Sequence, residues 1–139
     1  MSKIEVNTVE PQCGTTLTLG ASGDTVTLGS GASQSGFGRT GTVDWVTTVQ
    51  TSGFTAENGK GYFVNTTSGG ITVNLPAGNA GDIVAFKDYA NTFDTNNLTV
   101  GRNSQPIDGT ASDLTVSMEG AGFTLVYVNS TYGWLLKDK

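Results

Sequence analysis

Apolar and polar residues alternate along most of the chain, and this alternation predicts short β-strands. A period of two places apolar side chains on one face of a strand and polar side chains on the other. Glycine, asparagine and proline separate the alternating stretches, as is typical of turns, and no window carries apolar residues at helical spacing. We therefore predict an all-β fold, an antiparallel β-sandwich or jelly-roll-like domain, with strands within residues 43–45, 62–64, 70–76, 82–87, 98–100, 114–118, 123–128 and 134–136.

Two of these stretches are apolar enough to predict strands in the middle of the fold. Residues 82–87 are apolar on both faces, which is typical of a central strand covered from two sides. Residues 123–128 form the most apolar stretch of the chain and are expected to be the innermost strand.

The first 40 residues follow a looser pattern, which predicts an extended β arm and linker ahead of a domain at residues 41–139. A threonine–apolar alternation over residues 16–20 returns at residues 25–29, and glycine ends each unit. Two units are too few for a free-standing solenoid, which needs about three repeats, so one copy cannot bury their apolar side chains. We expect the arm to attach the chain to a neighbour or scaffold by strand addition, through Ile4, Val6, Leu17, Leu19, Val26 and Leu28.

Several stretches, taken in order, carry a family resemblance. They are residues 71–77, 80–88, 97–100, 107–109, 123–128 and 133–136, preceded by residues 3–9, 14–20 and 23–28. Together they resemble a β-rich module, with its usual N-terminal segment, that recurs in tail-fibre and other virion proteins of tailed bacteriophages, particularly marine ones. The resemblance implies a homotrimer on the virion surface that binds a capsid or tail protein. Because the chain has no long shaft, a short head appendage or capsid decoration is favoured over a complete tail fibre.

Composition and charge exclude two other classes of protein. The net charge is −5, and the seven Lys and Arg residues are scattered, whereas binding to nucleic acid needs clustered cations. No apolar run approaches the roughly 20 residues that span a bilayer, and the N-terminus has no signal-peptide pattern. We expect neither nucleic-acid binding nor membrane insertion, and synthesis in the host cytoplasm.

The residues needed for catalysis are sparse, and no enzyme activity, cofactor or metal site is expected. The chain has no histidine, and its lone cysteine, Cys13, has no basic neighbour in the sequence. Most aspartates of the second half stand beside Gly, Asn or Thr, where they favour turns through bonds to the nearby backbone. Asp94 and Asn96 begin like a calcium loop, but Leu98 stands where a third oxygen ligand is required.

Aromatic residues are better candidates for binding. Tyr89, Phe93 and Tyr132 fall in turn-rich segments and are candidate contacts for a host glycan or a partner protein. Trp45 and Trp134 are expected in the core or in a subunit interface, because large apolar residues are few. A structural role is thus the first hypothesis, carbohydrate recognition the alternative, and an inverting glycosidase a distant third.

Overall fold

The computed structural model describes residues 6–31 and 42–138. The chain divides into two units, residues 1–37 and residues 38–139, which are described separately. Within the described ranges, no helix is long and apolar enough to cross a membrane.

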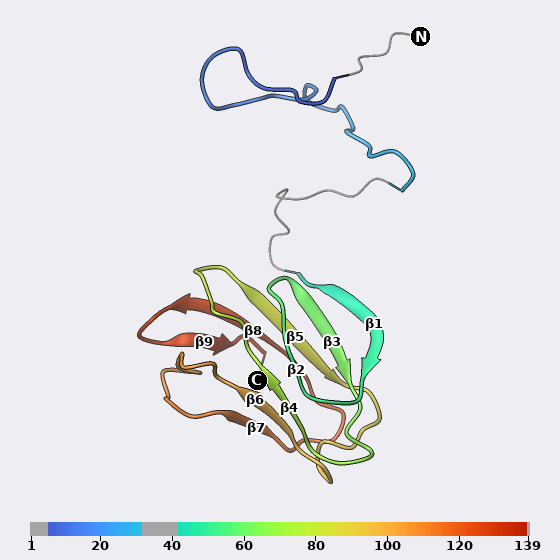
Figure 1. Cartoon of the computed structure of the whole chain (residues 1–139), viewed down its shortest axis with the longest axis vertical. Helices are drawn as coiled ribbons and strands as arrows, with labels where there is room; N and C mark the ends of the chain where they lie inside the picture. Colours follow the sequence, from blue (N-terminus) through green and yellow to red (C-terminus); the bar gives the residue numbers. More distant parts are fainter. Residues whose placement is uncertain (1–5, 32–41, 139) are drawn as a thin grey trace. The chain divides into compact units, whose positions relative to one another are not determined.

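The second unit is the β body, which consists of two sheets (Figure 1). The five-stranded sheet has the order β1-β3-β5-β8-β9 and the four-stranded sheet the order β2-β4-β6-β7. The expected all-β class is confirmed for the residues described. The five-stranded sheet comprises β1 (Asp44–Gln50), β3 (Lys60–Val64), β5 (Ile83–Asp88), β8 (Gly122–Asn129) and β9 (Gly133–Leu136). The four-stranded sheet comprises β2 (Phe54–Thr55), β4 (Ile71–Asn74), β6 (Leu98–Gly101) and β7 (Leu114–Val116).

Both sheets are mixed, so the expectation of an antiparallel domain is wrong. From β1 to β6 the chain alternates between the two sheets, and each sheet therefore receives successive strands in the same direction. The pairs β1–β3, β3–β5, β2–β4 and β4–β6 are parallel, whereas pairs involving β7, β8 or β9 are antiparallel. A jelly roll is antiparallel, and these parallel pairs do not support one.

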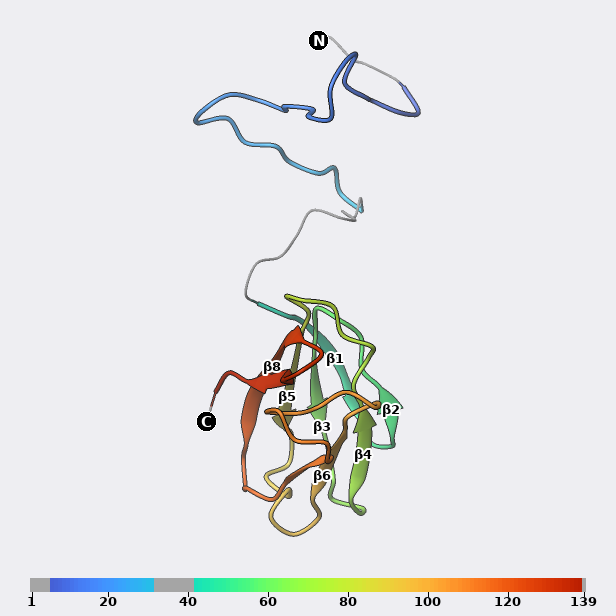
Figure 2. The same cartoon turned by 90° about the vertical axis from the view of Figure 1, so that its left-hand side faces the viewer.

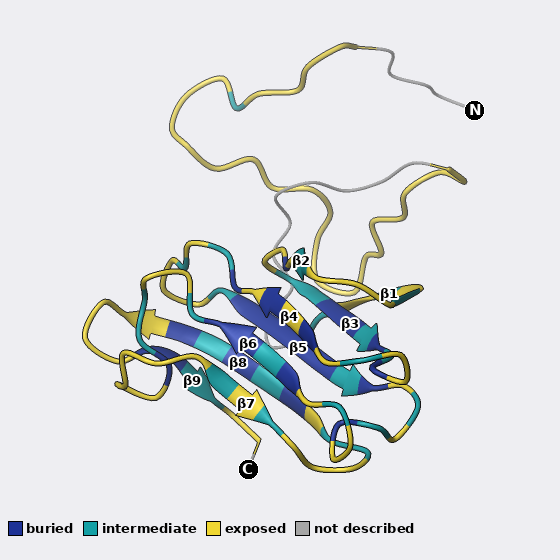
Figure 3. Ribbon diagram, turned by 60° about the horizontal axis from the view of Figure 1, so that its bottom comes forward, coloured by how far each residue is buried: buried dark blue, intermediate teal, exposed yellow. Residues whose placement is uncertain are grey.

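The core lies between the sheets, which face each other in Figure 2. Phe86 and Leu125 reach it from the five-stranded sheet, and Val73 and Leu98 from the four-stranded sheet; all four are fully buried. Trp134 is fully buried as well, as expected. Figure 3 shows this band of buried residues along the strands.

The middle strand of the larger sheet is β5, which confirms the expectation for residues 82–87. Its first four residues, Ile83 to Phe86, are buried although they alternate between the two faces. In β8 burial alternates, with Phe123, Leu125 and Tyr127 buried and the residues between them half-buried. The innermost strand is therefore β5, not β8 as expected.

The four-stranded sheet repeats one triplet, an apolar residue, a threonine and an apolar residue. The triplet begins at Ile71 in β4, at Leu98 in β6 and at Leu114 in β7. The strands align so that Thr72 pairs with Thr99, and Thr99 with Thr115. The threonines thus form one row on the outer face, while the apolar residues of each triplet point into the core.

In the first unit, the described residues 6–31 form no strand. The two threonine–apolar repeats were expected to be strands, but a strand is stabilised by hydrogen bonds to a partner. Within this segment of a single chain that pairing is not made. The segment is coloured as exposed almost throughout in Figure 3.

Candidate functional site

Apolar side chains of the N-terminal segment, residues 6–31, are the first candidate binding surface. Six of them are between 44% and 63% exposed: Val6, Val9, Leu17, Leu19, Val26 and Leu28. Five of these are among the predicted attachment residues, and the sixth predicted residue, Ile4, lies outside the described residues. Sequence analysis missed Val9, because it stands outside the alternating stretches.

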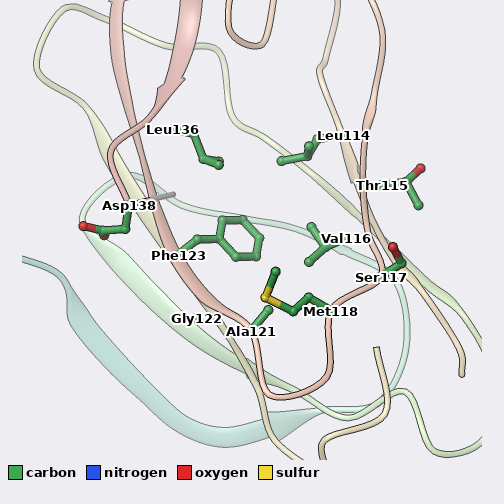
Figure 4. Close-up of a pocket in the computed structure, with 10 residues that line it drawn as sticks. All are labelled: Leu114, Thr115, Val116, Ser117, Met118, Ala121, Gly122, Phe123, Leu136 and Asp138. Atoms are coloured by element: carbon green, nitrogen blue, oxygen red, sulfur yellow. The ribbon is translucent and has the colours of Figure 1, made fainter. Parts of the chain in front are cut away.

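A free sheet edge with an apolar hollow beside it is the second candidate. The hollow has a volume of about 320 Å³ and lies next to β7, the edge strand of the four-stranded sheet. Its apolar lining is Leu114, Val116, Met118, Ala121, Phe123 and Leu136. In Figure 4 the apolar side chains converge on one space, whereas Thr115 and Ser117 point away from it. The hollow therefore has an apolar wall on each side and a hydroxyl-bearing rim.

Exposure at this edge differs from exposure inside the sheet. In β4 and β6 the apolar residues of the triplet are buried, whereas Leu114 and Val116 in β7 are half-buried. Met118, in the loop after β7, is 69% exposed. The β7 triplet thus has the pattern of a core strand, but no strand of residues 6–31 or 42–138 pairs with its outer side.

An aromatic platform on the outer face of the five-stranded sheet is the third candidate. Trp45 pairs with Gly61 across β1 and β3, and a Cβ on Gly61 would lie 2.8 Å from atoms Cδ2 and Cε3 of the indole. The indole therefore covers Gly61, and 45% of Trp45 remains exposed. Its ring centroid lies 4.9 Å from that of Phe63. Trp45 was expected in the core or in an interface, and the structure places it on the outer face.

Polar groups stand beside this platform. A second hollow, of about 250 Å³, is lined by both aromatic rings and by Lys87, Thr124 and Asp138. Hydrogen bonds from Lys137 and then Thr124 lower the pKa of Asp138, an exposed carboxylate. The platform thus combines a flat apolar surface with a cation, a hydroxyl and an anion.

The three predicted glycan contacts do not form one site. Phe93 is fully buried in the core, which corrects the expectation that it lies at the surface. Tyr89 and Tyr132 are each 56% exposed, but Tyr89 follows the end of β5 and Tyr132 follows the end of β8. These strands are antiparallel, with Ile83 opposite Val126 and Lys87 opposite Gly122, so the two tyrosines lie at opposite ends of the sheet, about 25–30 Å apart along it.

The aspartate that ends β5 explains why Phe93 is inside. The Asp88 carboxylate is buried and accepts hydrogen bonds from the backbone N–H groups of Thr92, Phe93 and Gly120 at 3.0–3.2 Å. Burial alone raises the pKa of Asp88, but the N–H groups of Phe93, Thr92, Gly120 and Ala90 outweigh it and lower the pKa below its usual value. The carboxylate holds two loops in place, as the turn interpretation of the aspartates predicts.

These features define a small all-β body with a free sheet edge and an N-terminal segment of exposed apolar side chains. Among proteins of known role, the chain is similar to the baseplate wedge protein gp10 of Enterobacteria phage T4, with 35% identity over 89 residues. The similar region is 60% of this chain and 15% of that protein, so the chain spans a small part of its relative. No family model matches the chain.

Proposed function

We propose that the chain is a non-enzymatic structural protein of a bacteriophage virion, with a β-sandwich body and an N-terminal attachment arm. The exposed apolar side chains of residues 6–31 carry the proposal. Burying one such side chain is worth about 1.5–3 kcal/mol, so a partner that covers several of them gains considerable free energy. The similarity to a phage baseplate protein supports the same role.

The finer parts of the proposal are the location and the oligomeric state. Similarity to a baseplate protein favours the tail over the capsid as the place of attachment. We propose a homotrimer, as the resemblance to virion proteins of tailed bacteriophages implies; a closed ring of copies also covers free sheet edges that a single body leaves open. Avidity over the copies then makes weak single contacts sufficient.

Deleting residues 1–30 tests the attachment role. The expected result is loss of the protein from purified particles, while the body keeps its β spectrum in far-UV circular dichroism and a cooperative urea transition. Particles that load the truncated protein as fully as the complete chain would contradict the role of the arm. Turnover in a glycan-hydrolysis assay would contradict the non-enzymatic assignment.

Carbohydrate recognition is the second candidate function, and the platform at Trp45 favours it. An exposed indole that covers a glycine of the sheet can stack against the apolar face of a sugar ring. Lys87 and Thr124 line the hollow beside it; the Lys87 ammonium donates one hydrogen bond to the Gly120 carbonyl and has two further N–H groups for sugar hydroxyls. Replacing Trp45 by Ala is expected to abolish retention on immobilised host polysaccharide, with Tyr89→Ala as a matched change of an exposed aromatic residue. Equal retention of the two variants would remove the platform as a glycan site.

A further inference from the structure

The four-stranded sheet has one strand fewer than the sheet it packs against. The hollow lies at the place of the missing strand, because Leu114 and Val116 of β7 line it from one sheet and Phe123 and Leu136 from the other. A fifth strand beside β7 would fill the hollow from the free edge. An apolar cavity of about 150 Å³ accommodates a benzene ring, so 320 Å³ has room for two leucine side chains.

The N-terminal segment contains the triplet from which this sheet is built. Leu17, Thr18 and Leu19 repeat the apolar–threonine–apolar order of β4, β6 and β7. Placed beside β7, the two leucines would enter the hollow and Thr18 would stand next to Thr115, continuing the outer row of threonines. The triplet is symmetric about its threonine, so this match holds for a parallel or an antiparallel strand.

We propose that residues 16–19 of one copy bind beside β7 of a second copy as the fifth strand of its four-stranded sheet. This inference rests on the proposed role of the arm in assembly and names its partner. Strand addition supplies backbone hydrogen bonds, and the alternate side chains supply specificity. It also covers the half-buried side chains of Leu114 and Val116.

Charge favours the first of the two repeats as the occupant. Residues 11–22 contain no charged residue, whereas Asp24 directly precedes the second repeat. The hollow is lined mainly by apolar side chains. An uncharged segment enters it without loss of hydration of a charge, whereas the carboxylate of Asp24 would have to be brought close to this apolar lining.

The exposure of the donor favours a second copy. Leu17 and Leu19 are 44% and 56% exposed in the single chain, so their apolar surface is left for a partner to cover. When a segment of one copy binds the body of the next, the contact is head-to-tail, and it closes into a ring of identical subunits when the rotation permits.

Cysteine cross-linking of the full chain tests the pairing. In a Cys13→Ser background, Thr18→Cys and Thr115→Cys are introduced together, because directly opposite residues of neighbouring strands come within disulfide reach. Under mild oxidation we expect linked products of two or more chains on a non-reducing gel. The matched control replaces Thr99 instead of Thr115; Thr99 belongs to the same row but one strand further in, about 10 Å from the added strand. We expect at least tenfold more product from the first pair.

Three outcomes overturn the inference. Equal yields from the two pairs would show that residue 18 does not lie beside β7. A disulfide within a single chain would place the segment in its own body. A third variant, Leu17→Asn with Leu19→Asn, must lower the oligomer mass measured by light scattering. Its control, Val6→Asn with Val9→Asn, changes similarly exposed residues outside the triplet and must leave the mass unchanged. Equal masses of the two variants would also contradict the inference.

The truncated chain and the cysteine variants together distinguish a failure of this inference from a failure of the proposed function. If the truncated chain fails to enter particles but residues 18 and 115 do not cross-link, the arm attaches the chain by another contact and only the inference is wrong. If the truncated chain enters particles normally, the proposed attachment role is wrong whatever the cross-linking shows.

Discussion

Replacing Asp88 by Asn is expected to destabilise the body strongly, although the two side chains have nearly the same shape. Oδ2 of Asp88 accepts the N–H groups of Phe93 and Gly120, and Oδ1 accepts that of Thr92. An asparagine can keep an oxygen at only one of the two positions. Its NH₂ group then faces an N–H donor, which is left unsatisfied in a buried place.

The size of the effect follows from these three bonds. A hydrogen bond to a charged group contributes about 1.5–3 kcal/mol and a neutral one about 0.5–1.5 kcal/mol, so two weakened bonds cost about 2 kcal/mol. The lost third bond adds about 1–2 kcal/mol, and the lower desolvation cost of a neutral amide offsets part of the total. We expect a decrease of about 3 kcal/mol in the free energy of unfolding, out of about 5–15 kcal/mol for such a domain.

Urea unfolding at pH 7 measures this decrease. With a slope near 1.5 kcal/mol per molar urea, the midpoint should fall by about 2 M. The control is Asp94→Asn in the same loop, where the carboxylate is exposed and bonds only to Thr95 among the bonds described; its effect should stay within about 0.5 kcal/mol. A midpoint shift below about 0.5 M for Asp88→Asn would refute the reasoning.

The wild type and the Asp88→Asn variant also allow a test of pH dependence. The pKa of Asp88 is lower in the folded than in the unfolded state, so its contribution is complete above the unfolded value, near 3.9, and is lost as the pH falls through the folded value. The gap in stability between the wild type and Asp88→Asn should therefore narrow as the pH falls below about 4. A gap that stays constant down to pH 2 would show that the ionised carboxylate is not the cause.

Two further pairs of substitutions test the fold. Gly133→Ala should lower the free energy of unfolding by more than about 3 kcal/mol, because φ is +68° and a Cβ would overlap the backbone carbonyl of Pro106. Gly81→Ala, with φ +94° and open space around it, should cost about 1 kcal/mol. Equal urea midpoints of the two variants would contradict this expectation. Phe93→Ala should lower the free energy of unfolding by about 3–5 kcal/mol, and Tyr89→Ala by less than about 1 kcal/mol. If the Phe93→Ala variant had the higher melting temperature of the two, the burial of Phe93 would be contradicted.

The sequence pattern predicts which residues form strands better than how the strands pair. Alternation of side chains identifies β4, β6 and β7, and runs of apolar residues identify β9 and the central position of β5, because residue types indicate whether one or both faces of a strand are buried. Alternation is the same in parallel and antiparallel strands, so it cannot show that the chain changes sheets after each of its first strands. The two residues of β2 are too few to form a pattern.

The candidate site is less predictable because it depends on contacts between distant segments. Phe93 looks like a loop aromatic, and only the bonds of its backbone N–H to Asp88 and the enclosing loop take it inside. The flat position of Trp45 depends on a glycine across the sheet, at position 61. Both relations require a register between strands that the local sequence does not determine.

The short free edge at β7 suits the proposed assembly role. Long exposed edge strands recruit other chains indiscriminately, but β7 has only three residues. A three-residue edge offers few backbone bonds, so it discriminates mainly through the two side chains that fit the hollow beside it. We expect one such contact to be weak, because it involves few backbone bonds and two side chains. In the proposed ring each copy gives one segment and receives another, and the contacts then strengthen one another through effective concentration.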